Sequence, residues 1–213
     1  MKTNKEIIED LMTRVDGYSF IHIGDIPDID LYMDQVTSFL DDRLKCSMRS
    51  PDEKALTKTM INNYAKNRLL PAPEKKKYSR EHMLLLICIF YFKNILSLSD
   101  IETLFGPMTS EYFSSDPSGA KPKLEEIYET ILRLNEKNMK DMKSDIKDKY
   151  SKAAAEIKGI NCSEDSRNYL VLFSFICELA MDAYLKKQMI EQIADEIMKD
   201  KVPAKGNHKK EKE

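Results

Sequence analysis

The chain has 213 residues, a net charge of −2, four cysteines and only six glycines. Its length suits one or two domains with a hydrophobic core, and 42% hydrophobic and 33% charged residues are typical of a globular, helix-rich protein. The strings GxGxxG, GxxxxGK and GxSxG do not occur in the sequence, which argues against the nucleotide-binding and hydrolase classes that use them.

Short helices separated by proline- and serine-containing connectors are predicted for the first half of the chain. Apolar residues at helical spacing, preceded by capping residues and followed by glycine or proline, mark where each helix begins and ends. The predicted elements are a helix capped by Asn4 and ended by Gly17, a helix after Pro27 capped by Asp28 or Asp30, a loop from Cys46 to Leu56, a helix from about Thr59 to Leu69, a basic loop or hairpin at Glu74 to Tyr78, and a helix capped by Ser79.

In the second half, Ser99 and Glu102 match a capping box, and Gly106-Pro107 is expected to end that short helix. Prolines and serines then indicate a linker, which is followed by a helical pattern up to Gly159 and a new helix from Ser163. The expected units are residues 1–24 (helix and connector), 25–106 (helix-turn-helix domain), 107–121 (linker), 122–199 (C-terminal helical region) and 200–213 (disordered charged tail).

Two uncharged apolar runs, Met83 to Phe92 and Asn168 to Cys177, have ten residues each. A bilayer span needs about 20 residues, so we interpret both runs as buried helix segments and expect no membrane association. The block Tyr169 to Leu185 is predicted to be almost fully buried, and Cys88 and Cys177 to be inert core thiols. Because no CxxC spacing and no signal peptide occur, we expect a cytoplasmic protein.

No catalytic, metal or cofactor site can be identified from the sequence. Of the three histidines, His22 and His82 lack a cysteine or carboxylate at ligand spacing, and His208 lies in the tail. The carboxylates follow helix-surface spacing without a recognisable pair. We therefore expect a protein that is not an enzyme and has neither a metal nor a cofactor.

Charge is distributed unevenly along the chain. Residues 1–42 carry three bases and ten acids, whereas residues 43–93 carry twelve bases and four acids. A positively charged segment of this kind attracts polyanions, although it is also compatible with a solvated face that the acidic N-terminus balances.

The short helix inside this basic segment has one polar side, which faces away from Ile61, Ala65 and Leu69. Asparagine is a poor helix former, yet two adjacent asparagines lie on this side between lysines. In a DNA major groove, asparagine can bond to adenine and lysine to phosphate, although an ordinary polar face is the alternative. The residues predicted to face the groove are Lys58, Thr59, Asn62, Asn63 and Lys66.

Three consecutive lysines follow this helix, after the prolines Pro71 and Pro73. On a short stiff loop they are typical of a wing that contacts phosphates. The residues of this loop that are predicted to hold phosphates are Lys75, Lys76 and Lys77.

The stretch from Leu56 to Phe105 resembles the MerR-type winged helix-turn-helix. MINNYAKNRLLP is similar to the recognition helix of that family, KKYSREHM to its wing exit, and LSLSDIETLF to its fourth helix. The strings DLYMDQVTSFLDDRL, LTKTMINNY and KKYS also resemble the bacterial domain-of-unknown-function family 1836 over roughly residues 25–110.

Several features depart from the MerR pattern. Asn62-Asn63 replaces Arg-Tyr, Arg68 occupies the place of a glycine, the wing is shorter, and the turn between the first two helices is longer. The resemblance implies an all-α fold, namely a MerR-like winged helix-turn-helix followed by a C-terminal helical bundle. With this resemblance, Tyr64 and Arg68 are also predicted to hold phosphates. The resemblance also implies a transcriptional regulator that binds duplex DNA as a homodimer, with a C-terminal region that could dimerise or bind a small-molecule effector. The alternative is a protein–protein adaptor of the same fold without DNA binding.

Overall fold

The computed structural model describes residues 2–50, 52–114 and 118–199. Within these ranges the regular structure is helical apart from one two-stranded sheet, so the predicted all-α class is confirmed. The elements are α1 (Asn4–Asp16), a 3₁₀ turn (Ile23–Asp25), β1 (Leu31–Tyr32), α2 (Met33–Arg43), a 3₁₀ turn (Lys45–Ser47), α3 (Lys58–Lys66), β2 (Lys77–Tyr78), α4 (Arg80–Phe92), α5 (Leu98–Pro107), a π-helical turn (Met108–Tyr112), α6 (Leu124–Lys158) and α7 (Glu164–Lys199).

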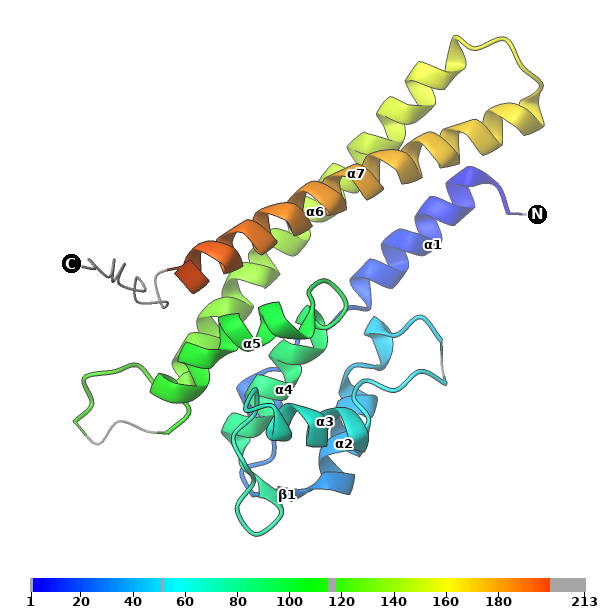
Figure 1. The fold of residues 1–213 in the computed structure, drawn as a ribbon. Helices are drawn as coiled ribbons and strands as arrows, with labels where there is room; N and C mark the ends of the chain where they lie inside the picture. Colours follow the sequence, from blue (N-terminus) through cyan, green and yellow to red (C-terminus); the bar gives the residue numbers. More distant parts are fainter. Residues whose placement is uncertain (1, 51, 115–117, 200–213) are drawn as a thin grey trace, which may run out of the picture.

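A small body formed by α2 to α5 lies at one end of a long hairpin of α6 and α7, and α1 lies beside this hairpin (Figure 1). The body is built around α4, whose sequence from Met83 to Phe90 is apolar on nearly every side. Buried side chains of α2, α3, α5 and the start of α6 form one cluster with those of α4. The strands β1 and β2 pair antiparallel, with Leu31 opposite Tyr78 and Tyr32 opposite Lys77.

Three helices begin at caps other than the predicted ones. Thr3 rather than Asn4 caps α1, in a capping box with Glu6. The capping box of α5 is formed by Ser97 and Asp100, because α5 begins two residues before the predicted position.

The predicted cap of α2 was also wrong. The residue pair Leu31-Tyr32 belongs to the sheet, so α2 begins after it, and the backbone N–H of Tyr32 donates to the Gln35 side chain at 2.8 Å. Neither Asp28 nor Asp30 therefore caps this helix.

The core of the body continues past residues 107–121 into α6. Leu124, Tyr128 and Leu132 are buried in the same cluster as α4. The Tyr128 hydroxyl donates a buried hydrogen bond of 2.8 Å to the carbonyl of Ile21. The start of α6 therefore packs as part of the body, across the predicted linker at 107–121.

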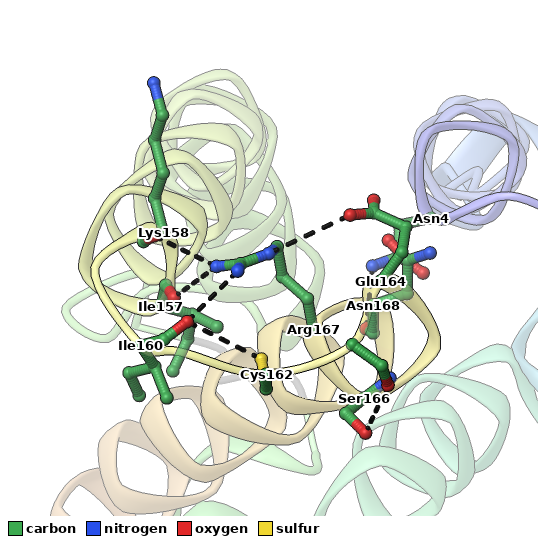
Figure 2. A network of polar contacts seen from close by, with 10 residues as sticks. Asn4, Ile157, Lys158, Ile160, Cys162, Glu164, Ser166, Arg167 and Asn168 are labelled. Carbon is green, nitrogen blue, oxygen red and sulfur yellow. Dashed lines mark hydrogen bonds and ion pairs between the residues drawn. The ribbon is translucent and has the colours of Figure 1, made fainter.

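The connection between α6 and α7 is held by Arg167. Its guanidinium donates to the carbonyls of Ile157 at 2.9 Å, Lys158 at 3.0 Å and Ile160 at 3.0 Å, as Figure 2 shows. These groups lie at the C-terminal end of α6, where carbonyls lack helical partners and a positive charge is favourable. Arg167 therefore both satisfies and electrostatically stabilises this turn.

The helix α1 packs against both arms of the hairpin. Ile8, Ala153 and Phe175 form a small buried cluster that joins the three helices. The Asn4 side chain donates to the Asn168 carbonyl at 2.8 Å (Figure 2). This packing fixes α1 on one side of α7.

The predicted burial of the block Tyr169 to Leu185 was wrong for most of its residues. Only Val171 and Phe175 are buried there, whereas Tyr169 is 64% exposed and Ile176 is 59% exposed. Cys177 is exposed as well, so it is not the core thiol that we expected. By length and composition alone, α7 could cross a membrane, and 11% of its most apolar window is buried.

Replacement of Tyr128 by phenylalanine tests the bond that joins α6 to the body. The variant leaves the buried Ile21 carbonyl without its donor, so we expect the free energy of unfolding to fall by about 1–3 kcal/mol in urea denaturation. The matched control Tyr32→Phe removes a hydroxyl from a side chain that is 54% exposed, and a change within about 0.5 kcal/mol is expected. Equal losses in the two variants would contradict this role of Tyr128.

Candidate nucleic-acid interface

The helix α3 separates an apolar side from a polar one. The Thr57 hydroxyl caps it by accepting from the Met60 N–H at 3.2 Å, and Ile61 and Tyr64 are buried against the body. All five residues predicted to face a DNA groove are exposed, namely Lys58, Thr59, Asn62, Asn63 and Lys66. The candidate interface therefore includes the whole polar side of α3.

Tyr64 does not belong to this surface. Its side chain is 6% exposed within the main core cluster, and burial raises the pKa of its phenol. Its carbonyl also accepts from the N–H groups of Leu69 and Leu70. Tyr64 thus serves in packing and in ending α3, and we leave it out of the candidate interface.

Arg68 follows the C-terminal end of α3 and has a backbone conformation that normally favours glycine. Its φ is 61°, its N–H donates to the Ala65 carbonyl at 3.2 Å, and the Leu69 N–H donates to the Tyr64 carbonyl at 2.9 Å. These bonds define a Schellman motif with Arg68 at the left-handed position. The Arg68 side chain is exposed, so an unfavourable backbone conformation presents a positive charge at the end of α3.

The predicted basic hairpin is present and is tight. Glu74 and Lys77 form a bridge, with the Lys77 N–H donating to the Glu74 carbonyl at 2.8 Å. The two residues between them, Lys75 and Lys76, have φ values of 49° and 65° and are exposed. Two-residue hairpins with both central φ values positive strongly prefer Asn-Gly or Gly-Gly, so two lysines here are an unfavourable choice for the turn itself.

The start of α2 lies between α3 and the hairpin. Lys58 of α3 forms an ion pair with Asp34, while the Lys77 ammonium lies 5.4 Å from the centre of the Tyr32 ring. Because Tyr32 and Asp34 are two residues apart, the N-terminal end of α3 and the strand of the hairpin are joined through one short segment. Lys77 is half-buried there, so Lys75 and Lys76 are the fully exposed lysines of the hairpin.

The long connection between α2 and α3 is anchored at its C-terminal end. The Ala55 N–H donates to the Asp41 carboxylate at 2.8 Å, and the Ala55 carbonyl accepts from the Lys93 ammonium at 2.6 Å. Lys54 adds an ion pair with Asp41 at 3.1 Å. Neither Asp41 nor Lys93 was identified from the sequence, although both fix the place where α3 begins.

The buried His82 joins the residues after α3 to the start of α4. Its Nδ1 accepts from the Ser79 N–H at 3.0 Å, and its Nε2 lies 3.2 Å from the Pro71 carbonyl, so Nε2 carries the proton. The Ser79 hydroxyl donates to Glu81 at 2.6 Å, so the group forms a helix cap. Burial lowers the pKa of His82, which favours the neutral ring that this arrangement requires.

Features outside this surface offer little for ligand chemistry. Within the described ranges, no group of three or more His, Cys, Asp or Glu side chains is placed to hold a metal ion. Burial raises the pKa of the Cys88 thiol to about 12, which makes it a poor nucleophile. A hollow of about 250 Å³ lies between His22 and the residues Glu129, Arg133 and Glu136 of α6, below the size of most sites for drug-sized ligands.

The depressed pKa of His82 predicts a loss of stability in mild acid. In the unfolded chain His82 has a pKa of about 6.5 and binds a proton below that pH, whereas the folded protein disfavours the protonated ring. The free energy of unfolding should therefore fall as the pH decreases from 6.5 toward the lower pKa of His82 in the folded protein. Urea denaturation at several pH values measures how the free energy of unfolding changes with pH, and one titrating group contributes up to about 1.4 kcal/mol per pH unit to this slope. In His82→Gln, whose amide oxygen can still accept from Ser79, this contribution to the slope should disappear, and an unchanged slope would contradict the prediction.

A family model described as a domain of unknown function, DUF1836, matches residues 21–131. The matched range, just over half of the chain, nearly coincides with the main core cluster, which extends from Ile21 to Leu132. No curated protein and no solved structure matches the chain. The chain thus belongs to the DUF1836 family, as the strings around α2, α3 and β2 predicted.

Proposed function

We propose that the body formed by α2 to α5 is a winged helix-turn-helix of MerR type that binds duplex DNA, as a transcriptional regulator does. The observation that carries this proposal is the unfavourable backbone at three basic residues. Within the described ranges, every residue other than glycine with a positive φ is basic and exposed: Arg68, Lys75 and Lys76.

Unfavourable backbone conformations at non-glycine residues are concentrated at functional sites. Glycine at position 68, or Asn-Gly at positions 75 and 76, would make the same turns at lower cost in free energy. Arginine and lysine add a positive charge at each of these turns, and that charge suits the phosphate backbone of a nucleic acid.

The order of the elements supports a helix-turn-helix. The helices α2 and α3 are followed by the hairpin at Glu74–Lys77 and by β2, then by α4 and α5, which is the order of helices and wing in the MerR-type pattern. The strand β1, with which β2 pairs, precedes α2. The departure lies in the connection of 14 residues between α2 and α3, against roughly three to four in most such motifs. The bonds of Asp41 and Lys93 to Ala55 compensate by anchoring this connection just before α3.

The polar side of α3 provides groups that can read bases. Asn62 and Asn63 are exposed in the middle of the helix, where an amide can bond to both N6 and N7 of adenine. Lys66 lies one turn further along, and Arg68 lies at the end of the helix. We therefore assign base contacts to the two asparagines, and phosphate contacts to Lys66, Arg68, Lys75 and Lys76.

Fluorescence anisotropy on random and genomic duplexes between about 50 and 300 mM salt tests this assignment. The wild type should bind selectively, and its log affinity should fall with log salt by about 0.9 for each phosphate contact. Asn62→Ala/Asn63→Ala should lose selectivity and keep the salt slope, because it removes no charge. Failure of the wild type to bind at the lowest salt would contradict the proposal and favour the adaptor.

A substitution in the hairpin separates stability from binding. Lys75→Asn/Lys76→Gly introduces the preferred turn, so its free energy of unfolding should rise by about 1 kcal/mol, while its salt slope should fall by about two. The matched control Lys75→Gln/Lys76→Gln removes the same charges and keeps the unfavourable backbone. It should show the weaker binding without the gain in stability.

The outcome that would contradict the role of these lysines is DNA affinity equal to that of the wild type in both variants. If only Lys75→Asn/Lys76→Gly weakened binding, the shape of the turn rather than its charge would be responsible.

A further inference from the structure

The outward side of α7 carries a continuous apolar face that no part of the described chain covers. Its residues follow helical spacing over roughly 24 Å from Tyr169 to about Leu185. The members of this face, which we call the α7 face, are Tyr169, Phe173, Ile176, Cys177, Ala180, Met181 and Tyr184, all of them exposed.

The charged residues in this stretch lie away from the α7 face. Between Tyr169 and Tyr184 the only charged residues are Glu178 and Asp182, and both are half-buried. Asp182 accepts from Lys149 of α6 at 3.2 Å and from Lys186 at 2.9 Å. Asp182 therefore faces α6, and the opposite side of the helix is apolar.

Packing elsewhere holds α7 in this orientation. Arg167 fixes the turn at the start of α7, and the bond from Asn4 to the Asn168 carbonyl keeps α1 against the hairpin (Figure 2). Phe175 is buried between α1 and α6 in the small cluster with Ile8 and Ala153. Rotation of α7 to hide its apolar face would break these contacts.

The remainder of the chain offers no suitable cover. Residues 200–213 contain eight charged side chains, and valine, proline and alanine are their only apolar residues other than glycine. The other residues outside the described ranges are single positions or, at 115–117, Ser-Asp-Pro. An apolar surface of this length needs a partner that is apolar itself.

The large side chains of the α7 face are exposed along its whole length. Tyr169, Phe173, Ile176, Met181 and Tyr184 are each at least 50% exposed. Stable dimers bury roughly 800 Å² or more on each partner, so an interface here has to use the full length of this face.

We propose that the α7 face is the interface with a second copy of this chain. In a two-fold dimer the same face meets itself, so an uncharged stripe is self-complementary, and tyrosine, phenylalanine and methionine are enriched at the centres of interfaces. The acids Glu164, Asp165, Glu178 and Asp182 outnumber the single base Arg167 along this part of α7, which disfavours an anionic lipid surface. This proposal is independent of DNA binding.

Sedimentation equilibrium of the full chain tests the interface. The wild type should show twice the chain mass of 24.7 kDa at micromolar concentration, whereas Phe173→Glu/Ile176→Glu should be monomeric. The control Ile29→Glu places one glutamate at a side chain that is 67% exposed in the connector before β1, and it should remain dimeric. A monomeric wild type, or a dimeric double variant, would overturn the proposal.

Cross-linking at Cys177 locates the contact. Cys177 lies near the middle of the α7 face, which extends from Tyr169 to Tyr184, so a two-fold dimer should bring the two Cys177 thiols together. A short bismaleimide should therefore link Cys46→Ser/Cys162→Ser into a covalent dimer. The control Cys177→Ser, which keeps the exposed Cys46, should not be linked. Cross-linking through Cys46 alone, or loss of the dimer upon binding to anionic vesicles, would overturn the proposal.

Discussion

The burial of α4 is the constraint on which the remainder of the body depends. A helix that is apolar on nearly all sides must be surrounded, and α2, α3, α5 and the start of α6 supply the buried side chains that do so. Its few polar side chains at the two ends bind the irregular segments. Arg80 donates to the Ile26 carbonyl at 3.3 Å, His82 to Pro71 at 3.2 Å and Lys93 to Ala55 at 2.6 Å. Three connections of the body are therefore positioned by one helix.

The sequence predicted the helices well and their first residues poorly, for a physical reason. Helical periodicity reflects burial over several turns, so one ambiguous residue does not hide it. A cap depends on one side chain, and Thr3 and Asn4, or Ser97 and Ser99, are chemically equivalent candidates. For α2 the decisive factor was the pairing of Leu31 with Tyr78, a contact between residues far apart in sequence that no local pattern contains.

The sequence predicted which residue types form the candidate interface, but it did not predict their backbone conformations. The polar side of α3 followed from the spacing of Ile61 and Ala65, whereas Tyr64, assigned to phosphate from the resemblance to MerR-type helices, is 6% exposed in the core. The positive φ values at Lys75 and Lys76 require the strand pairing of their neighbours, because isolated lysines avoid that region. The main support for the proposed function is therefore a feature that only the structure provides.

The apolar block in α7 was misread because composition does not say which surface will cover it. Hydrophobic residues at helical spacing look the same whether their own chain or another molecule buries them. The family match ends at residue 131, and Leu132 is the last buried member of the main core cluster, against which Ile190 of α7 also packs. The part of α7 from Tyr169 to Leu185 contributes no side chain to this cluster, so it is not needed to bury α4. An apolar face retained on this part of α7 is therefore better explained by a contact outside the chain than by the stability of the body.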